Sequence, residues 1–178
     1  MKFSKITISG LICTGKTSLF WGLQEELVWP TFSTSQYFRD YARTHRFLLE
    51  KAEEQNDKIT KKVDFRVAKM LKEKGNLLVE GWMAGIMADN YPGIFKILLV
   101  CDDAVRIQRF AEREKVDLKE AEKKVVEREK NLLGTLARIY KRNDFLEPEK
   151  YDLVFDTTKT TKKQLIKTML DKLGFKET

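Results

Sequence analysis

Eight residues near the N-terminus constrain the fold of this chain more than any other feature. They read GLICTGKT, from Gly10 to Thr17, and match the pattern G-x-x-x-x-G-K-[ST] at every fixed position. Such a loop binds phosphate where it joins a buried strand to a helix N-terminus, because successive backbone N–H groups then point at one anion. The flanks fit this context, since residues 3–9 alternate and then run apolar as a short strand does. Apolar residues recur at helical spacing immediately afterwards, at Leu19, Phe20, Leu23 and Leu27.

The positions of this phosphate loop predict its chemistry. Glycines 10 and 15 permit the backbone torsions that turn N–H groups inward. Lys16 can reach the β and γ phosphates of a nucleotide, and Thr17 can offer its hydroxyl to Mg²⁺. Cys13 lies near the helix N-terminus, where a thiol pKa can fall, so it is either a reactive thiolate or an inert small side chain.

The rest of the chain alternates between strand and helix patterns. Continuous apolar runs at residues 76–80, 95–101 and 151–155 are typical of strands buried on both faces of a parallel sheet, and residues 31–34 fit a short strand. Helical patterns fill the intervals, at residues 36–46 with Ser35 as N-cap, 48–74, 103–115, 118–141 and 162–173. This alternation predicts an α/β fold, a doubly wound parallel sheet of about five strands with ligands outside the strands' carboxyl ends.

Composition excludes several classes of protein. With 178 residues and 42% hydrophobic side chains, the chain can bury a core as one domain spanning residues 1–178. No apolar run approaches the roughly 18 to 20 residues that span a bilayer, which predicts a cytoplasmic protein without membrane contact. Two cysteines and one histidine exclude a disulfide framework and a structural zinc site. The net charge of +7 is largely local, with 12 basic and 7 acidic residues between positions 106 and 142, so that stretch is expected to meet an anion.

Several side chains outside the loop are candidates for chemistry. Glu80 ends a buried strand, where it could hold a water on Mg²⁺, act as a general base, or be a solvated carboxylate. Arg39 is either an anion ligand or a surface arginine. Three arginines share one helical face by their i, i+3, i+7 spacing, and another follows on the next helix. Any one of them alone would be interpreted as part of a solvated face, but together they match the charge that spreads over a phosphoryl group in transfer. These four are Arg106, Arg109, Arg113 and Arg128.

The ordered segments ISGLICTGKTS, STSQYFRDYA, LLVEGWMAG, RIQRFAERE, VEREK and YDLVFDTTK resemble the archaeal-type cytidylate kinases, over nearly the whole chain. The resemblance implies a P-loop kinase fold with a helical monophosphate-binding insert near residues 35–75 and a lid near 114–135. It implies that Arg113 and Arg128 belong to the lid, and with Lys16 they are the expected catalytic residues. Thr17 and Glu80, the latter through water, are the expected Mg²⁺ ligands. The ATP-binding residues that the resemblance implies are Gly10, Leu11, Ile12, Cys13, Thr14, Gly15, Lys16, Thr17 and Ser18. The acceptor-binding residues that it implies are Arg39, Asp64 and Arg66. Trp82 departs from the family pattern and is a further acceptor-binding candidate, which could stack on a base or simply fill the pocket.

The function expected from this resemblance is Mg²⁺-dependent phosphoryl transfer from ATP to a nucleoside monophosphate, CMP or dCMP above others. Trp82 stands where the family typically has arginine, and Thr135 stands near the place of a second family arginine. Stacking on an indole tolerates every base, so a relaxed acceptor choice is expected. Two alternatives stay open: a small-molecule kinase that uses Glu80 as base on a hydroxyl acceptor, and a non-catalytic nucleotide-binding regulator. A monomer is expected, and nucleic acid is an unlikely ligand because no recognised RNA-binding module is present.

Overall fold

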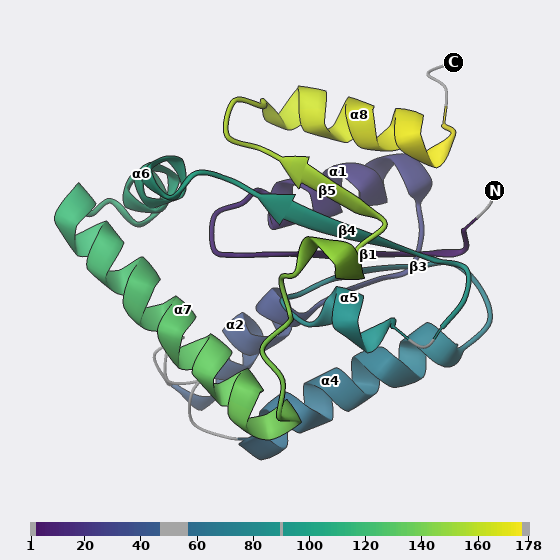
Figure 1. Cartoon of the computed structure of the whole chain (residues 1–178), viewed down its shortest axis with the longest axis horizontal. Coiled ribbons are helices and arrows are strands. Elements are labelled where there is room, and N and C mark those ends of the chain that lie inside the picture. The colour runs from purple at the N-terminus through teal and green to yellow at the C-terminus, as the bar shows by residue number, and fades with distance from the viewer. Residues whose placement is uncertain (1–2, 47–56, 90, 176–178) are drawn as a thin grey trace.

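The computed structural model describes residues 3–46, 57–89 and 91–175 and is built on one parallel sheet (Figure 1). The strands are β1 (Lys5–Gly10), β2 (Thr31–Ser33), β3 (Leu77–Glu80), β4 (Ile94–Val100) and β5 (Leu153–Asp156). Their order across the sheet is β2-β3-β1-β4-β5, and every neighbouring pair is parallel. The predicted five-stranded parallel α/β sheet is therefore confirmed. Each strand lies close to the apolar run that predicted it.

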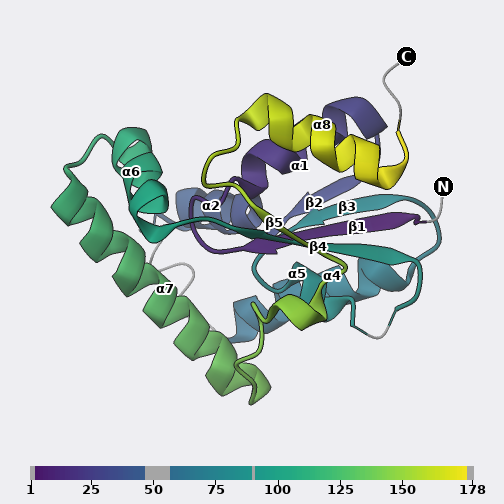
Figure 2. The ribbon, with the colours of Figure 1, turned by 45° about the horizontal axis from the view of Figure 1, so that its top comes forward.

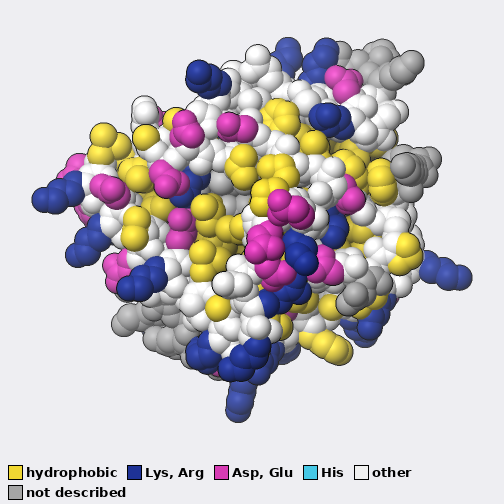
Figure 3. All heavy atoms as spheres, in the orientation of Figure 1, with side chains coloured by type: hydrophobic (Ala, Val, Ile, Leu, Met, Phe, Trp, Pro, Cys, Tyr) yellow, Lys and Arg dark blue, Asp and Glu magenta, His cyan; other side chains and the backbone are white. Residues whose placement is uncertain are grey.

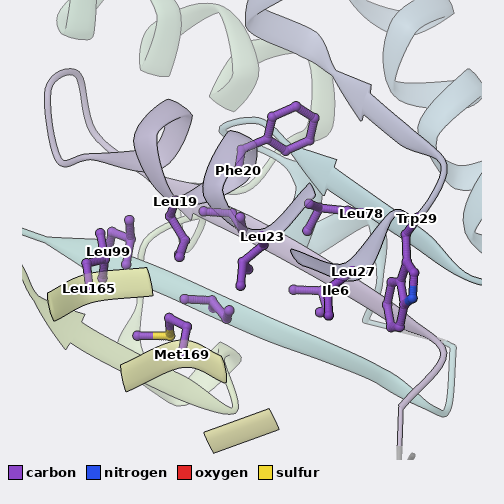
Figure 4. Close-up of a cluster of buried hydrophobic side chains, with 12 residues drawn as sticks. Ile6, Leu19, Phe20, Leu23, Leu27, Trp29, Leu78, Leu99, Leu165 and Met169 are labelled. Carbon is purple, nitrogen blue, oxygen red and sulfur yellow. The ribbon is translucent and has the colours of Figure 1, made fainter. Parts of the chain in front are cut away.

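Helices cover both faces of this sheet (Figures 1 and 2). On one face lie α1 (Lys16–Leu27) and α8 (Lys162–Leu173), and on the other lie α4 (Asp57–Lys72) and α5 (Ala84–Met87). Alternate residues of β3 point to opposite faces, so Leu78 packs with α1 while Leu77 and Val79 pack with α4. Figure 4 shows the larger core between α1, the sheet and α8, with Phe20, Leu23 and Met169 buried in it.

The helices at the carboxyl ends of the strands are α2 (Thr34–His45), α6 (Asp103–Glu114) and α7 (Leu118–Tyr140). The short 3-10 turn η1 (Pro148–Lys150) precedes the amino end of β5. The N-cap of α2 is Ser33, whose hydroxyl accepts a hydrogen bond from the Gln36 N–H at 3.1 Å, so the prediction of Ser35 as N-cap was wrong. A serine two residues earlier satisfies the helix's free N–H group, and Ser35 is left to donate elsewhere.

The predicted insert and lid correspond to helices that also belong to the packed body. The described part of the insert contains α2 and α4, and α4 buries Val67 and Leu71 against the sheet. Residues 47–56, which the sequence assigned to one long helix with residues 57–74, lie outside the described residues. The lid region contains the turn between α6 and α7 and most of α7, which runs across one end of the molecule (Figure 2).

The surface carries its charges unevenly. Lys and Arg side chains gather where the C-terminal end of α7 lies beside α4 (Figure 3). Within the described ranges, no helix has both the length and the apolar character to cross a membrane.

Candidate active site

A cavity of about 830 Å³ opens at the carboxyl ends of the strands. It is lined by the phosphate loop, the start of α2, the residues that follow β3 and β5, and the facing sides of α6 and α7. Six of its lining side chains are basic and two are acidic, so the cavity suits a strongly anionic ligand. The basic ones are Lys16, Arg39, Arg109, Arg113, Arg128 and Lys162.

The phosphate loop joins β1 to α1 in the predicted order. Gly10 and Gly15 have φ angles of 146° and 93°, which residues with a side chain rarely adopt. A Cβ on Gly10 would also lie 2.4 Å from the carbonyl oxygen of Leu99, so this glycine is required for space as well as for torsion. Cys13 takes a left-handed φ of 59° without being glycine. Of the predicted ATP-binding residues, those from Ile12 to Ser18 except Thr14 line the cavity.

Lys16 is folded back onto its own loop. Its Nζ donates a hydrogen bond of 2.7 Å to the carbonyl oxygen of Leu11 and lies 5.6 Å from the ring centre of Trp82. Burial lowers the pKa of Lys16 below its ordinary value, and the nearby Glu80 carboxylate opposes that shift. An incoming phosphate would add negative charge beside this ammonium and favour its charged form.

Glu80 is fully buried from solvent at the end of β3 but lines the cavity. Its two carboxylate oxygens accept hydrogen bonds from the hydroxyls of Ser33 at 2.5 Å and Ser35 at 3.1 Å. These bonds fix the carboxylate in place, so the solvated strand-end carboxylate considered from sequence is excluded. Thr17 is exposed on the first turn of α1 and lines the same cavity. The structure therefore brings the two predicted metal ligands to one site.

The arginines of α6 fall into two groups. Arg106 is only 3% exposed and donates to the carbonyl oxygen of Ile12 at 3.0 Å. Arg109 donates to the carbonyl oxygen of Thr157 at 2.8 Å and to that of Cys13 at 3.4 Å. Both support the loop's backbone from outside the cavity's centre. The expectation that all three arginines of this face meet a transferring phosphoryl group was therefore wrong for Arg106, because its guanidinium is buried against the protein.

Three predicted cations converge on the cavity. Arg113 is half-exposed, with its guanidinium over the ring of Phe110 and paired with Glu114 at 2.8 Å. Arg128 on α7 and Arg39 on α2 line the cavity from two other sides. The structure thus places positive groups on both sides of the phosphate loop, where separate phosphate groups could be held.

Trp82 separates the main cavity from a smaller one. It lines both, and the second cavity holds about 30 Å³, the space of a single water molecule. Asp64 of α4 lines the small cavity and accepts a hydrogen bond of 2.6 Å from the hydroxyl of Tyr140. Burial raises the pKa of Asp64 to about 6, although the Tyr140 hydroxyl acts in the opposite direction. Arg66 lies elsewhere, with its guanidinium 4.9 Å from the ring centre of Phe32.

The hypothesis of a reactive Cys13 thiolate is not supported. Burial raises the pKa of the Cys13 thiol above its ordinary value, and this effect exceeds the lowering by Arg113, Lys16 and Arg106. The sequence predicted a lowered pKa from the helix N-terminus alone. It did not show that the loop is buried against α6 and α7. The thiol is a small side chain in a constrained loop.

Comparison with known proteins places this site in a family. The model of the cytidylate kinase-like family matches residues 22–159. The chain belongs to the cytidylate kinase-like family. The match starts after the phosphate loop, so membership in the cytidylate kinase-like family does not depend on that widespread motif.

Curated relatives in this family agree with the match. A cytidylate kinase of Methanopyrus kandleri is 31% identical over 182 residues, which cover 94% of this chain and 93% of the relative. A cytidylate kinase of Pyrococcus abyssi is 33% identical over 157 residues, covering 86% and 84%. The resemblance to archaeal-type cytidylate kinases is thereby confirmed.

Solved structures share the fold of this family member. An uncharacterized protein from Eubacterium ventriosum superposes with a TM-score of 0.70 at 16% identity, over 97% of this chain and 99% of that one. A gluconokinase from Sinorhizobium meliloti gives 0.62 at 12% identity, over 96% and 91%. A shikimate kinase from Bacteroides thetaiotaomicron gives 0.60 at 14% identity, over 96% and 98%. At these identities the likeness concerns the fold alone, and it confirms the predicted P-loop kinase fold.

Sequence reasoning on this cytidylate kinase-like chain missed several residues in or next to the site, among them Trp21, Thr157 and Glu129. Trp21 lines the cavity and is 42% exposed. Its position, four residues after Thr17 on the same helix, was a signal that could have been read. Thr157, which follows β5, and Glu129 of α7 form hydrogen bonds to the phosphate loop, and their distance from it in sequence gave no such signal.

Proposed function

We propose that this chain transfers the γ-phosphoryl group of ATP to a nucleoside monophosphate, with CMP or dCMP as the favoured acceptor. The observation that carries the proposal is the single cavity in which Lys16, Arg39, Arg113 and Arg128 meet. A donor triphosphate and an acceptor monophosphate bring several negative charges together, and cations on opposite sides of the site can neutralise both.

The donor is assigned to the phosphate loop. Its backbone turns around the positions of Gly10 and Gly15, and the N-terminus of the 12-residue helix α1 supports an anion there. Lys16 would exchange its bond to the Leu11 carbonyl for one to the β and γ phosphates. Trp21 offers an exposed ring at the edge of the same cavity.

The residues present fit Mg²⁺. Thr17 supplies a hydroxyl oxygen and Glu80 a carboxylate, and Mg²⁺ prefers such oxygen ligands while keeping several waters. Within the described residues, no group of three or more acidic, histidine or cysteine side chains could hold a metal alone. Thr17 and Glu80, the latter through water, would therefore hold the ion together with nucleotide phosphates. When bound, Mg²⁺ would neutralise phosphate charge.

Catalysis by this chain would rest on positioning and charge. A phosphate acceptor is already ionised at neutral pH, so no general base is needed. Arg113 and Arg128 are proposed to meet the charge that spreads over the transferring group. Arg113 is half-exposed, as a side chain that must approach a moving phosphoryl group requires.

Asp64 supports an acceptor with an exocyclic amino group. An ionised carboxylate accepts hydrogen bonds only, so it suits the amino group of cytosine and disfavours the carbonyl at the same position of uracil. The small cavity beside Asp64 holds one water, so a base could reach the carboxylate only when the Trp82 side chain turns aside. Arg39 would hold the acceptor phosphate in the main cavity, and Arg66 is proposed as an outer acceptor contact on α4.

A hydroxyl acceptor with Glu80 as base has weaker support. A base must contact the acceptor hydroxyl, whereas the Glu80 carboxylate is fully buried and each of its oxygens accepts a hydrogen bond from a serine hydroxyl. The two proposals predict different effects of two substitutions. Arg39→Ala should abolish transfer to a monophosphate acceptor, whereas Glu80→Gln should abolish transfer to a hydroxyl acceptor. A regulator would bind nucleotide without turnover.

The test is an ADP-release assay over all common ribo- and deoxyribonucleoside monophosphates, with the Lys16→Ala protein as blank. We expect turnover with CMP or dCMP above the others. Turnover of no monophosphate by a protein that binds ATP would favour the regulator. Turnover of a sugar or another hydroxyl compound in their place would favour the hydroxyl acceptor.

A further inference from the structure

The backbone of Ile12, in the phosphate loop, is held from outside at both of its polar groups. Its N–H donates a hydrogen bond of 3.0 Å to Oε1 of Glu129 on α7. Its carbonyl oxygen accepts one of 3.0 Å from Nη1 of Arg106 on α6. The same Nη1 donates to Oε1 of Glu129 at 2.6 Å, so the three residues form a closed ring of hydrogen bonds. The ring connects the loop to α6 and α7.

This ring is shielded from water. The side chains of Arg106 and Glu129 are 4% and 13% exposed, and Asp103 balances the arginine with a second carboxylate at 2.5 Å. Charge-assisted bonds in such surroundings are short and directional. The ring therefore fixes the position of Ile12 more firmly than a surface contact would.

The next residue explains why the loop needs this support. Cys13 has a φ of 59°, a left-handed conformation that a residue with a Cβ adopts unfavourably. Its carbonyl oxygen accepts a bond of 3.4 Å from Arg109, one helical turn after Arg106 on α6. The strained residue thus follows one that is held by α6 and α7 and is itself held by α6.

We propose that Glu129, acting with Arg106, is a positioning residue for ATP binding that keeps the phosphate loop in its anion-binding shape. The inference rests on the donor half of the proposed function, and it extends the donor site to two residues that do not line the cavity. Glu129 lies on α7, so its hydrogen bond to the Ile12 N–H also sets how closely α7 approaches the loop. Arg128, the preceding residue, is held near the loop in the same way.

The experiment measures ADP binding by titration calorimetry in the presence of Mg²⁺, because ADP carries the β-phosphate and needs no acceptor. Glu129→Gln keeps the size of the side chain and removes its charge. We expect its Kd for ADP to rise about tenfold, which corresponds to about 1.4 kcal/mol. The matched control is Glu127→Gln, an exposed glutamate on the same helix, whose Kd should equal that of the wild type.

A rescue separates positioning from a general loss of stability. Glycine adopts a positive φ without strain, so Cys13→Gly should reduce the need for the ring. Adding Glu129→Gln to Cys13→Gly should weaken ADP binding about threefold, in place of tenfold. Arg106→Lys, which cannot bridge Ile12 and Glu129 in the same way, should weaken binding as Glu129→Gln does and carries the test if the latter does not fold.

Several results would overturn the inference. ADP binding by a folded Glu129→Gln protein that equals the wild type would remove Glu129 from loop positioning. Tighter binding would show that its carboxylate competes with phosphate for the Ile12 N–H. An equal tenfold loss with and without Cys13→Gly would mean that the ring does not act through loop strain. A wild type that binds neither ADP nor ATP would contradict the proposed donor site itself, which is a distinct outcome.

Discussion

Replacing Asp64 with asparagine is expected to stabilise the folded chain at neutral pH. Asp64 is 7% exposed, and burial raises its pKa to about 6 from an ordinary value of 3.8. At a pH above its pKa in both states, such a carboxyl is ionised more easily in the unfolded chain than in the folded one, and this difference favours unfolding. The difference of about two pKa units corresponds to roughly 3 kcal/mol at pH 7.

The direction of the pH dependence follows from the same shift. Between about pH 4 and pH 6 the folded state binds the proton of Asp64 and the unfolded state does not. The contribution of this group to stability is therefore complete below about pH 4 and is lost as the pH rises through about 6. Asparagine does not titrate, so the Asp64→Asn protein lacks this loss.

Part of the gain is offset by the new amide. Its oxygen can still accept the Tyr140 hydroxyl, but its NH₂ group must find partners in a confined space, which costs about 1 kcal/mol or more. We therefore expect Asp64→Asn to be more stable than the wild type by about 1 to 2 kcal/mol at pH 7.5. The advantage should shrink and disappear as the pH falls toward 4. If Asp64 reads the acceptor's amino group, kcat/KM for CMP should fall in the same variant.

The assay is urea unfolding of both proteins at several pH values from 4.5 to 8. Asp57→Asn is an informative control, because the Arg138 guanidinium holds the pKa of the exposed Asp57 carboxyl below its ordinary value. Replacing the Asp57 carboxylate should change stability in the opposite direction, so the Asp57→Asn protein should be less stable than the wild type at neutral pH. An Asp64→Asn protein that is less stable than the wild type at pH 7.5, with a difference independent of pH, would refute the burial argument.

Three further predictions concern the reaction. Lys16→Ala should abolish ADP release, and turnover at the wild-type rate would remove the phosphate loop from the mechanism. Arg113→Ala and Arg128→Ala should each lower kcat more than they raise the KM for ATP, because the charge that they are proposed to meet develops in the transition state; a change in KM alone would reassign that arginine to ground-state binding. The wild type should use several monophosphates within about tenfold in kcat/KM, and Trp82→Arg should sharpen the preference for CMP. Strong selectivity that Trp82→Arg leaves unchanged would show that other residues read the base.

The parts of the fold that follow from local pattern could be predicted from the sequence. Buried parallel strands are apolar throughout, as in β4, and the phosphate loop is compatible with few other contexts. The prediction of Ser35 as N-cap failed because Ser33, Thr34 and Ser35 all have a side-chain hydroxyl. Local sequence does not tell which of these hydroxyls caps the helix, and both Ser33 and Ser35 also donate to the Glu80 carboxylate, more than 40 residues away.

The parts of the site that depend on distant pairs could not be predicted. Helical spacing put Arg106, Arg109 and Arg113 on one face, and the structure agrees. Helical spacing does not show which of these guanidinium groups is buried against the protein and which is exposed to solvent. That difference depends on Glu129, which lies 23 residues after Arg106, and on the carbonyl groups of a loop almost a hundred residues earlier.

These distant pairs connect α7 to two separate parts of the molecule, the phosphate loop and α4. Near its middle, Glu129 binds the phosphate loop, and near its C-terminal end Arg138 and Tyr140 bind Asp57 and Asp64 of α4. One helix therefore contacts both the proposed donor site and the proposed acceptor pocket. A movement of α7 as a rigid body would change both sites together, because neither set of bonds can stretch by more than a few tenths of an ångström and persist. A substrate that repositions this helix would therefore affect both the phosphate loop and α4.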